Sequence, residues 1–361
     1  MERFYSLPHA SIDFYFRQTP RDFVVEEIPL YEFSNDGEHL ILHIRKKELS
    51  TIELVEIIAK YLDIHPKEIG YAGLKDKHAM TKQYISIHKK HEEMMDAFTH
   101  ENIKILSKTY HDNKIRIGHL KGNRFFIKLK KVMPSAATKI DEALKAIKIY
   151  GMPNFYGYQR FGNDGDNYII GEKIAKGERK ERNVKLKKLL ISAYQSHLFN
   201  KWLNKRLQIN SLVESFSVSE LESVLEIPKE ELEKLKAQKH PFKIISGDLM
   251  EHYPHGRLFE FEGTKHDFER FETRDISVTG LLSGKKVKLA QGIAGKIEKE
   301  FFDAIGEDGA RRYAWIYPTE IEGKYHAEDA QYELHFSLPK GSYATVFLEE
   351  IAKRKIDVNK I

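Results

Sequence analysis

Residues 70–83, GYAGLKDKHAMTKQ, form a glycine-containing loop between a segment with helical periodicity and one with strand periodicity. The two glycines permit backbone angles closed to other residues, so we expect a tight loop with one carboxylate, Asp76, at its crest. Lys75 and Lys77 flank Asp76, favour its ionised form and attract polyanions. An acid in a basic loop suits chemistry on nucleic acid. On spacing alone, an ordinary turn or helix-capping aspartate is the favoured alternative.

Periodic patterns surround this loop. Alternating apolar residues predict a half-buried strand at 40–45, and 50–53 form a capping box for a helix that ends before Pro66. The strand leaving the loop is predicted at 84–88. The apolar face of the helix is expected to comprise Ile52, Val55, Ala59 and Leu62.

Later segments predict a mixed α+β chain. Two or three short strands are expected over 103–130, interrupted by a loop at 118–124. A long helix is expected from about residue 186, short strands over 257–287, and an amphipathic strand over 331–338.

The amino-acid composition limits the number of domains and the kinds of function that this chain can have. At 361 residues, two domains are expected. The formal net charge is only +5, so a nucleic-acid surface must come from local clusters of basic residues. The chain has no cysteine, which excludes disulfides, thiolate nucleophiles and cysteine-ligated metals. No secretion signal or membrane-length apolar stretch is evident, and we expect a cytoplasmic protein.

Residues 72–83 resemble the signature A-G-x-K-D-(R/K)-x-A-x-T-x-Q of the TruD family of tRNA pseudouridine synthases, in which the aspartate is catalytic. Residues 17–27, RQTPRDFVVEE, are similar to the family's amino-terminal block. Two further family-like blocks follow in the family's order, NFYGYQRFG at 154–162 and LPKGSYAT at 338–345.

The resemblance implies a fold and a domain division. It implies an α/β (α+β) chain with a discontinuous pseudouridine synthase catalytic domain, whose mixed sheet is largely antiparallel. That domain is expected at residues 1–179 and 318–361, and an inserted α/β TRUD domain at 180–317.

The resemblance also implies roles for individual residues. Asp76 takes the catalytic position, and Arg17 matches the basic residue that pairs with the catalytic carboxylate. The substrate-binding positions are Phe23, Asn154, Tyr156 and Tyr343. Without the family, core packing is the favoured interpretation of Phe23. The order Phe155-Tyr156 departs from the commoner Tyr-Phe, which leaves open which ring faces the base.

Basic residues around these blocks are candidate contacts to the RNA backbone, although Arg124 can equally be only part of the polar side of a strand. They are Lys75, Lys77, Lys82, Arg124 and Arg160.

The implied activity is an isomerase that converts uridine to pseudouridine in tRNA, with uridine 13, the family's usual target, as the expected site. The reaction breaks the N1–C1′ bond and rejoins the base through C5, so no cofactor, metal or nucleotide is expected. A carboxylate serves either as nucleophile or as proton acceptor, and the sequence does not choose. The expected partner is tRNA, with no membrane association and a monomeric chain. The alternative is a non-catalytic RNA-binding or RNA-folding factor.

Overall fold

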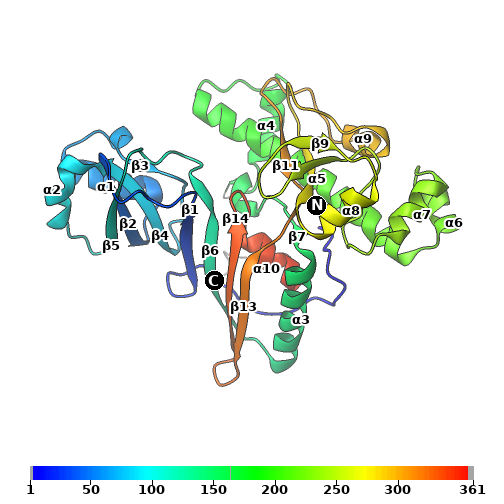
Figure 1. Ribbon diagram of the computed structural model, residues 1–361, viewed down its shortest axis with the longest axis horizontal. Coiled ribbons are helices and arrows are strands. Elements are labelled where there is room, and N and C mark those ends of the chain that lie inside the picture. Colours follow the sequence, from blue (N-terminus) through cyan, green and yellow to red (C-terminus); the bar gives the residue numbers. More distant parts are fainter. Residues whose placement is uncertain (1–2, 163, 357–361) are drawn as a thin grey trace. The chain divides into compact units, whose positions relative to one another are not determined.

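The computed structural model describes residues 3–162 and 164–356, and the chain forms two compact units (Figure 1). Unit 1 comprises residues 1–10, 146–317 and 345–353, and unit 2 comprises residues 11–145, 318–344 and 354–361. Both units are therefore discontinuous in sequence. The functional division at residues 179/180 and 317/318 stays a prediction, because packing units and functional domains need not share borders.

Unit 2 is built on an eight-stranded sheet in the order β13-β14-β6-β1-β4-β2-β5, with β3 paired to β4. Its strands are β1 (Phe23–Pro29), β2 (His39–Lys47), β3 (Gly70–Tyr71), β4 (Met80–His88), β5 (Ile103–His111), β6 (Leu120–Lys130), β13 (Thr319–His326) and β14 (Gln331–Pro339). Only the pairing of β1 with β4 is parallel among the described strands of this sheet, which confirms the mixed, largely antiparallel sheet. Figure 1 shows β14 lying beside β6, so the last strands extend the sheet begun by the first 130 residues.

The helix after β2 confirms the predicted capping box. In α1 (Thr51–Leu62), the Ser50 hydroxyl accepts from the Glu53 backbone N–H while the Glu53 carboxylate accepts from Ser50. The predicted apolar face was wrong at its first position, since Ile52 is 51% exposed and Thr51 is buried instead. The face that packs on β2 consists of Leu54, Val55, Ile58, Ala59 and Leu62.

The remaining helical elements that begin among the residues of unit 2 are short except for α3. They are the 3₁₀ turns Pro66–Glu68 and Lys89–His91, α2 (Glu92–Asp96), α3 (Pro134–Tyr150) and α10 (Ala344–Ala352). The predicted loop at 118–124 was wrong, because β6 already begins at Leu120. Gly122 belongs to that strand, where a Cβ would overlap the Leu338 carbonyl of β14.

Unit 1 combines one long helix with a small sheet in the order β11-β10-β8-β9 and the pair β12-β7. Its helical elements are η3 (Tyr158–Phe161), α4 (Asn167–Ala175), α5 (Val184–Ser215), α6 (Val218–Val224), α7 (Lys229–Ala237), α8 (Lys265–Glu272) and α9 (Gly292–Lys299). Its strands are β7 (Met152–Pro153), β8 (Leu249–His252), β9 (Leu258–Glu260), β10 (Ile276–Leu282), β11 (Ala310–Tyr313) and β12 (Trp315–Ile316). The prediction of strands alone over 257–287 missed α8, although Thr264 caps it and Phe268 and Phe271 are spaced as on one face of a helix. Among the described residues, no helix is both long and apolar enough to cross a membrane.

Candidate active site

The loop that carries Asp76 is fixed to the start of α1. The Lys75 backbone N–H donates to the Thr51 hydroxyl at 2.8 Å, and that hydroxyl donates to the Gln83 side-chain carbonyl at 3.0 Å. Thr51 and Gln83 are fully buried, so these bonds are shielded from competing water. The Thr51 hydroxyl therefore ties the loop at Lys75 to α1 and, through Gln83, to β4.

A buried lysine also contacts this loop. The Lys46 side chain, on β2, is completely buried, and its ammonium donates to the Leu49 carbonyl and, at 3.4 Å, to the Asp76 carbonyl. Burial lowers the pKa of Lys46 to about 8, although the charge of Asp76 opposes the shift. The sequence analysis missed Lys46, because the run Arg45-Lys46-Lys47-Glu48 looks like an exposed strand end.

Asp76 is an exposed residue, but the surrounding protein atoms partly desolvate its carboxyl group. This desolvation raises the pKa of the Asp76 carboxyl. The nearby charges of Lys46, His78 and Lys75 act in the opposite direction and favour the carboxylate. The Asp76 carboxyl can be exposed and yet partly desolvated, because neighbouring protein atoms displace bulk water from around it without covering it. An accessible carboxylate with cations around it can act as nucleophile or as base.

Arg17 is exposed and, within the described parts of the chain, makes no ion pair. An ion pair between Arg17 and Asp76 is not formed among the described residues, and the expected pairing stays a prediction. The cations that act on Asp76 are the three named above.

Phe23 is 3% exposed at the start of β1. Its ring lies edge-on to Phe16 at 5.8 Å between centroids and parallel to Phe125 at 6.2 Å. This position supports the core-packing alternative, and a contact between Phe23 and the substrate stays a prediction.

The five candidate phosphate contacts differ in availability. Lys75 is buried, and its ammonium pairs with the Glu27 carboxylate at 2.6 Å, a geometry that does not favour contact with RNA. Three others form exposed or partly exposed ion pairs, which are worth at most about 1 kcal/mol and which a phosphate can displace. These pairs are Lys77–Glu53, Lys82–Glu26 and Arg124–Glu320.

In unit 1, the Asn154 side chain is held from both ends. Its amide N–H donates to the Tyr313 carbonyl at 3.0 Å, and its amide oxygen accepts from the Arg312 guanidinium at 2.9 Å. The same guanidinium donates to the Asn154 backbone carbonyl at 3.1 and 3.2 Å. Asn154 is 5% exposed, so its amide orientation is fixed inside the protein.

Arg312 also orients the Tyr156 ring. The guanidinium carbon lies 3.9 Å from the centre of that ring, a close cation–π contact. The Tyr156 backbone exchanges hydrogen bonds with the Asn200 side chain at 2.9 and 3.0 Å. Of the two adjacent rings, Phe155 is buried under Arg3, whereas Tyr156 is partly exposed. The sequence analysis missed Arg312, since nothing in the pair Arg311-Arg312 distinguishes one arginine from the other.

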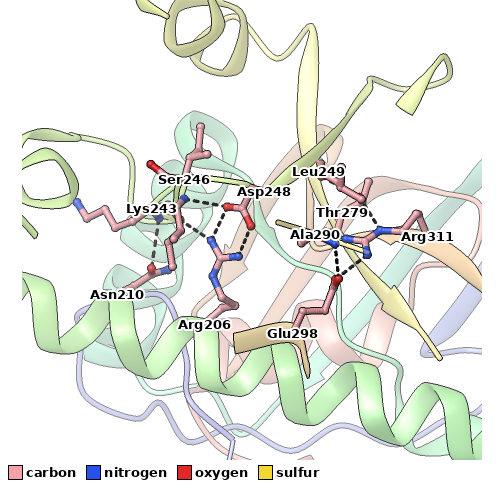
Figure 2. A network of polar contacts seen from close by, with 12 residues as sticks. Arg206, Asn210, Lys243, Ser246, Asp248, Leu249, Thr279, Ala290, Glu298 and Arg311 are labelled. Atoms are coloured by element: carbon pink, nitrogen blue, oxygen red, sulfur yellow. Dashed lines mark hydrogen bonds and ion pairs between the residues drawn. The ribbon is translucent and has the colours of Figure 1, made fainter. Parts of the chain in front are cut away.

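Arg311 points into the interior of unit 1 and anchors strand β11. Its guanidinium donates to the Glu298 carboxylate and to the Thr279 backbone carbonyl, both at 2.6 Å (Figure 2). Burial raises the pKa of the Glu298 carboxyl, and the charge of Arg311 opposes that shift. A second buried pair in Figure 2 joins Arg206 to Asp248 at 2.6 and 2.8 Å. The contacts of Arg311 fix β11, the strand from which Arg312 also extends.

The candidate site residues thus fall into two sets. Arg17, Phe23, Asp76 and Tyr343 belong to unit 2, whereas Asn154, Tyr156 and Arg160 belong to unit 1. Tyr343 is partly buried directly before α10, and the Arg160 guanidinium donates to the Ser196 hydroxyl at 3.0 Å and lies 5.6 Å from the Tyr156 ring. In the described residues, no cluster of three or more His, Asp or Glu side chains is arranged to hold a metal ion.

Comparison with known proteins gives a consistent result. The family model for tRNA pseudouridine synthase D (TruD) matches residues 2–183 and 180–351. The tRNA pseudouridine synthase D of Sulfurimonas denitrificans is 71% identical over 356 residues, covering 99% of this chain and 100% of that protein. That of Nitratiruptor sp. is 55% identical over 357 residues, covering 99% of each chain. The crystal structure of a putative tRNA pseudouridine synthase D from Methanosarcina mazei is similar in fold, with a TM-score of 0.64 at 22% identity over 98% of this chain and 96% of that one.

Proposed function

Because the chain belongs to the TruD family of tRNA pseudouridine synthases, isomerases that convert uridine to pseudouridine, we propose that its target is uridine 13 of tRNA and that Asp76 is the catalytic residue. The observation that carries the proposal is the Asp76 loop, which matches the family's catalytic signature. Its backbone is bonded to buried Thr51 and Lys46, which fixes the main chain that carries the Asp76 carboxylate. Preorganisation of this kind is what a reaction at a single sugar carbon requires.

The reaction needs no outside reagent. The N1–C1′ bond breaks, the uracil turns, a C5–C1′ bond forms, and the proton lost from C5 is balanced by one gained at N1. Asp76 either attacks C1′ as a nucleophile or removes a proton from the sugar while the base leaves, and both routes use the ionised form. The charges of Lys46, His78 and Lys75 support that form.

A stacked base is out of reach of Asp76, so the target nucleotide must be flipped out at a cost of a few kcal/mol. Stacking on an aromatic ring offsets this by roughly 1–3 kcal/mol per base. Tyr156, held by Arg312, is the first candidate ring, and Phe23 and Tyr343 complete the proposed set. Asn154 is proposed to bind the flipped nucleotide, and Arg17 to pair with Asp76 once RNA is bound.

The proposed division of labour assigns catalysis to residues 1–179 and 318–361 and a supporting role in tRNA binding to the inserted residues 180–317. Lys77, Lys82, Arg124 and Arg160 are the proposed backbone contacts. The enzyme is proposed to act as a monomer in the cytoplasm, where its tRNA substrate is found, without a metal or nucleotide cofactor.

The test uses tRNA from cells that lack this protein. The tRNA is incubated with the wild type, with Asp76→Ala or with the isosteric Asp76→Asn, and its pseudouridines are then mapped. We expect the wild type to convert uridine 13 and both variants to be inactive. Activity that survives in both variants would contradict the role of Asp76, and conversion at another position alone would contradict the target. A wild type that retains tRNA but leaves every uridine unchanged would favour the non-catalytic RNA-binding alternative.

A further inference from the structure

A basic pocket lies on strand β5, an edge strand of the sheet in unit 2. Its volume is about 570 Å³, within the range that holds a nucleotide-sized ligand. Its lining carries the cations of Arg45, Lys47, Lys104 and Lys108, the carboxylates of Asp96 and Glu101, and the rings of Phe98 and His100, so the cations outnumber the carboxylates. The functional roles proposed above use none of them.

The cations of the pocket gather on neighbouring strands. Arg45 and Lys47 are alternate residues of β2 and therefore share one side of it, and Lys104 of β5 lies directly opposite Arg45 in the strand register. Within the described chain, Arg45, Lys47 and Lys104 form no ion pair, whereas Lys108 pairs with Asp96.

The unpaired cations of the pocket differ from the basic residues near the Asp76 loop. Lys77, Lys82 and Arg124 are each paired with a glutamate. A phosphate that binds Arg45, Lys47 or Lys104 displaces no carboxylate. Binding there therefore breaks no existing ion pair and costs less free energy than binding to Lys77, Lys82 or Arg124. Unpaired cations in a concave site are what a polyanion with spaced charges recognises.

Two rings in the pocket offer flat surfaces. Phe98 and His100 are nearly parallel, at 9° with centroids 6.5 Å apart. The Tyr61 ring contacts Phe98 edge-on at 5.0 Å, and the His100 ring accepts a hydrogen bond from the Asn102 backbone N–H at 3.1 Å. These contacts fix both rings, and a fixed ring stacks on a base of any sequence.

We propose that this pocket binds a segment of the tRNA outside the target nucleotide, with phosphates on Arg45, Lys47 and Lys104 and an unpaired base against Phe98 or His100. The proposal rests on the proposed function only in taking tRNA as the ligand. Strand β2 connects the pocket to the catalytic loop, because Lys46, between Arg45 and Lys47, donates to the Asp76 carbonyl. A tRNA held here is therefore anchored at a fixed place relative to Asp76 within one unit.

The test compares two triple variants with the same change in charge. Arg45→Gln, Lys47→Gln and Lys104→Gln together remove the unpaired cations of the pocket. The matched control replaces three exposed lysines on α1 and α3, Lys60→Gln, Lys139→Gln and Lys145→Gln. Dissociation constants for unmodified tRNA are measured at several salt concentrations, and turnover is measured at saturating tRNA.

We expect the pocket variant to bind tRNA roughly tenfold or more weakly at physiological salt, with the slope of log K against log salt reduced by about two to three. The control variant should change either quantity far less, and turnover at saturation should stay within about twofold of wild type. His100→Ala should weaken binding without changing the salt slope, since stacking releases no counterions. Equal effects in the pocket and control variants would overturn the proposal, as would a loss of saturated turnover with unchanged binding. Binding is read without turnover, so failure here is distinct from failure of the Asp76 assignment.

Discussion

Replacing Lys46 by methionine should change how the stability of unit 2 depends on pH. The pKa of Lys46 falls from the usual 10.5 of a lysine to about 8, because burial disfavours the charged form. The unfolded chain then holds this proton more tightly than the folded chain, so the contribution of Lys46 to the free energy of unfolding rises with pH above about 8. Since one pKa unit corresponds to about 1.4 kcal/mol, the rise between about pH 7 and about pH 10 amounts to roughly 2–3 kcal/mol.

Lys46→Met removes this titration, so its stability relative to wild type should fall by that amount over the same range. Urea unfolding should be followed by circular dichroism, because both tryptophans, Trp202 and Trp315, lie in unit 1 and do not report on unit 2. Lys60→Met, which replaces an exposed lysine of α1, serves as the control and should track the wild type at every pH. A constant difference between wild type and Lys46→Met across the whole range would refute the reasoning.

Three further changes probe unit 1. Arg206→Met leaves the buried Asp248 carboxylate without its partner and should lower the free energy of unfolding by about 3–5 kcal/mol, measured by tryptophan fluorescence in urea. Adding Asp248→Leu should recover most of this loss of stability. If the double variant stays as unstable as Arg206→Met, the argument from an unpaired buried charge is contradicted. Gly280→Ala places a Cβ against the Trp202 ring and should cost about 1–3 kcal/mol by the same assay, whereas wild-type stability would show that the ring can move. Arg312→Lys keeps the charge but loses the forked contacts, and should reduce turnover on tRNA about tenfold with unfolding unchanged; full activity would show that these contacts do not position the site.

Local patterns in the sequence were enough to predict several elements. The strands β2 and β14 and the capping box of α1 depend on residues close in the chain, and their existence is confirmed. The alternation itself is broken at Ile41 and Ser337, which are buried although they lie on the faces opposite the predicted core. The errors occurred where contacts between residues distant in sequence determine which side chains are buried. Thr51 replaces Ile52 in the buried face because its hydroxyl bonds to Gln83 and to the Lys75 backbone.

The Asp76 loop and the family were accessible from the sequence because their signature is a contiguous run of residue types at fixed spacing. The residues that surround the loop in space could not be identified from the sequence. Lys46 and Lys47 look alike in the chain, yet one is completely buried and the other is exposed.

The sequence by itself therefore determined the kind of chemistry, the residues proposed to perform it and the strands and helices with strong periodicity. Only the tertiary structure decided which charged groups support those residues. Arg312 and Asn154 are 158 positions apart, and their hydrogen bonds exist because β11 brings the guanidinium to the amide. Such contacts depend on the pairing and packing of distant segments, and no local spacing of residue types specifies them.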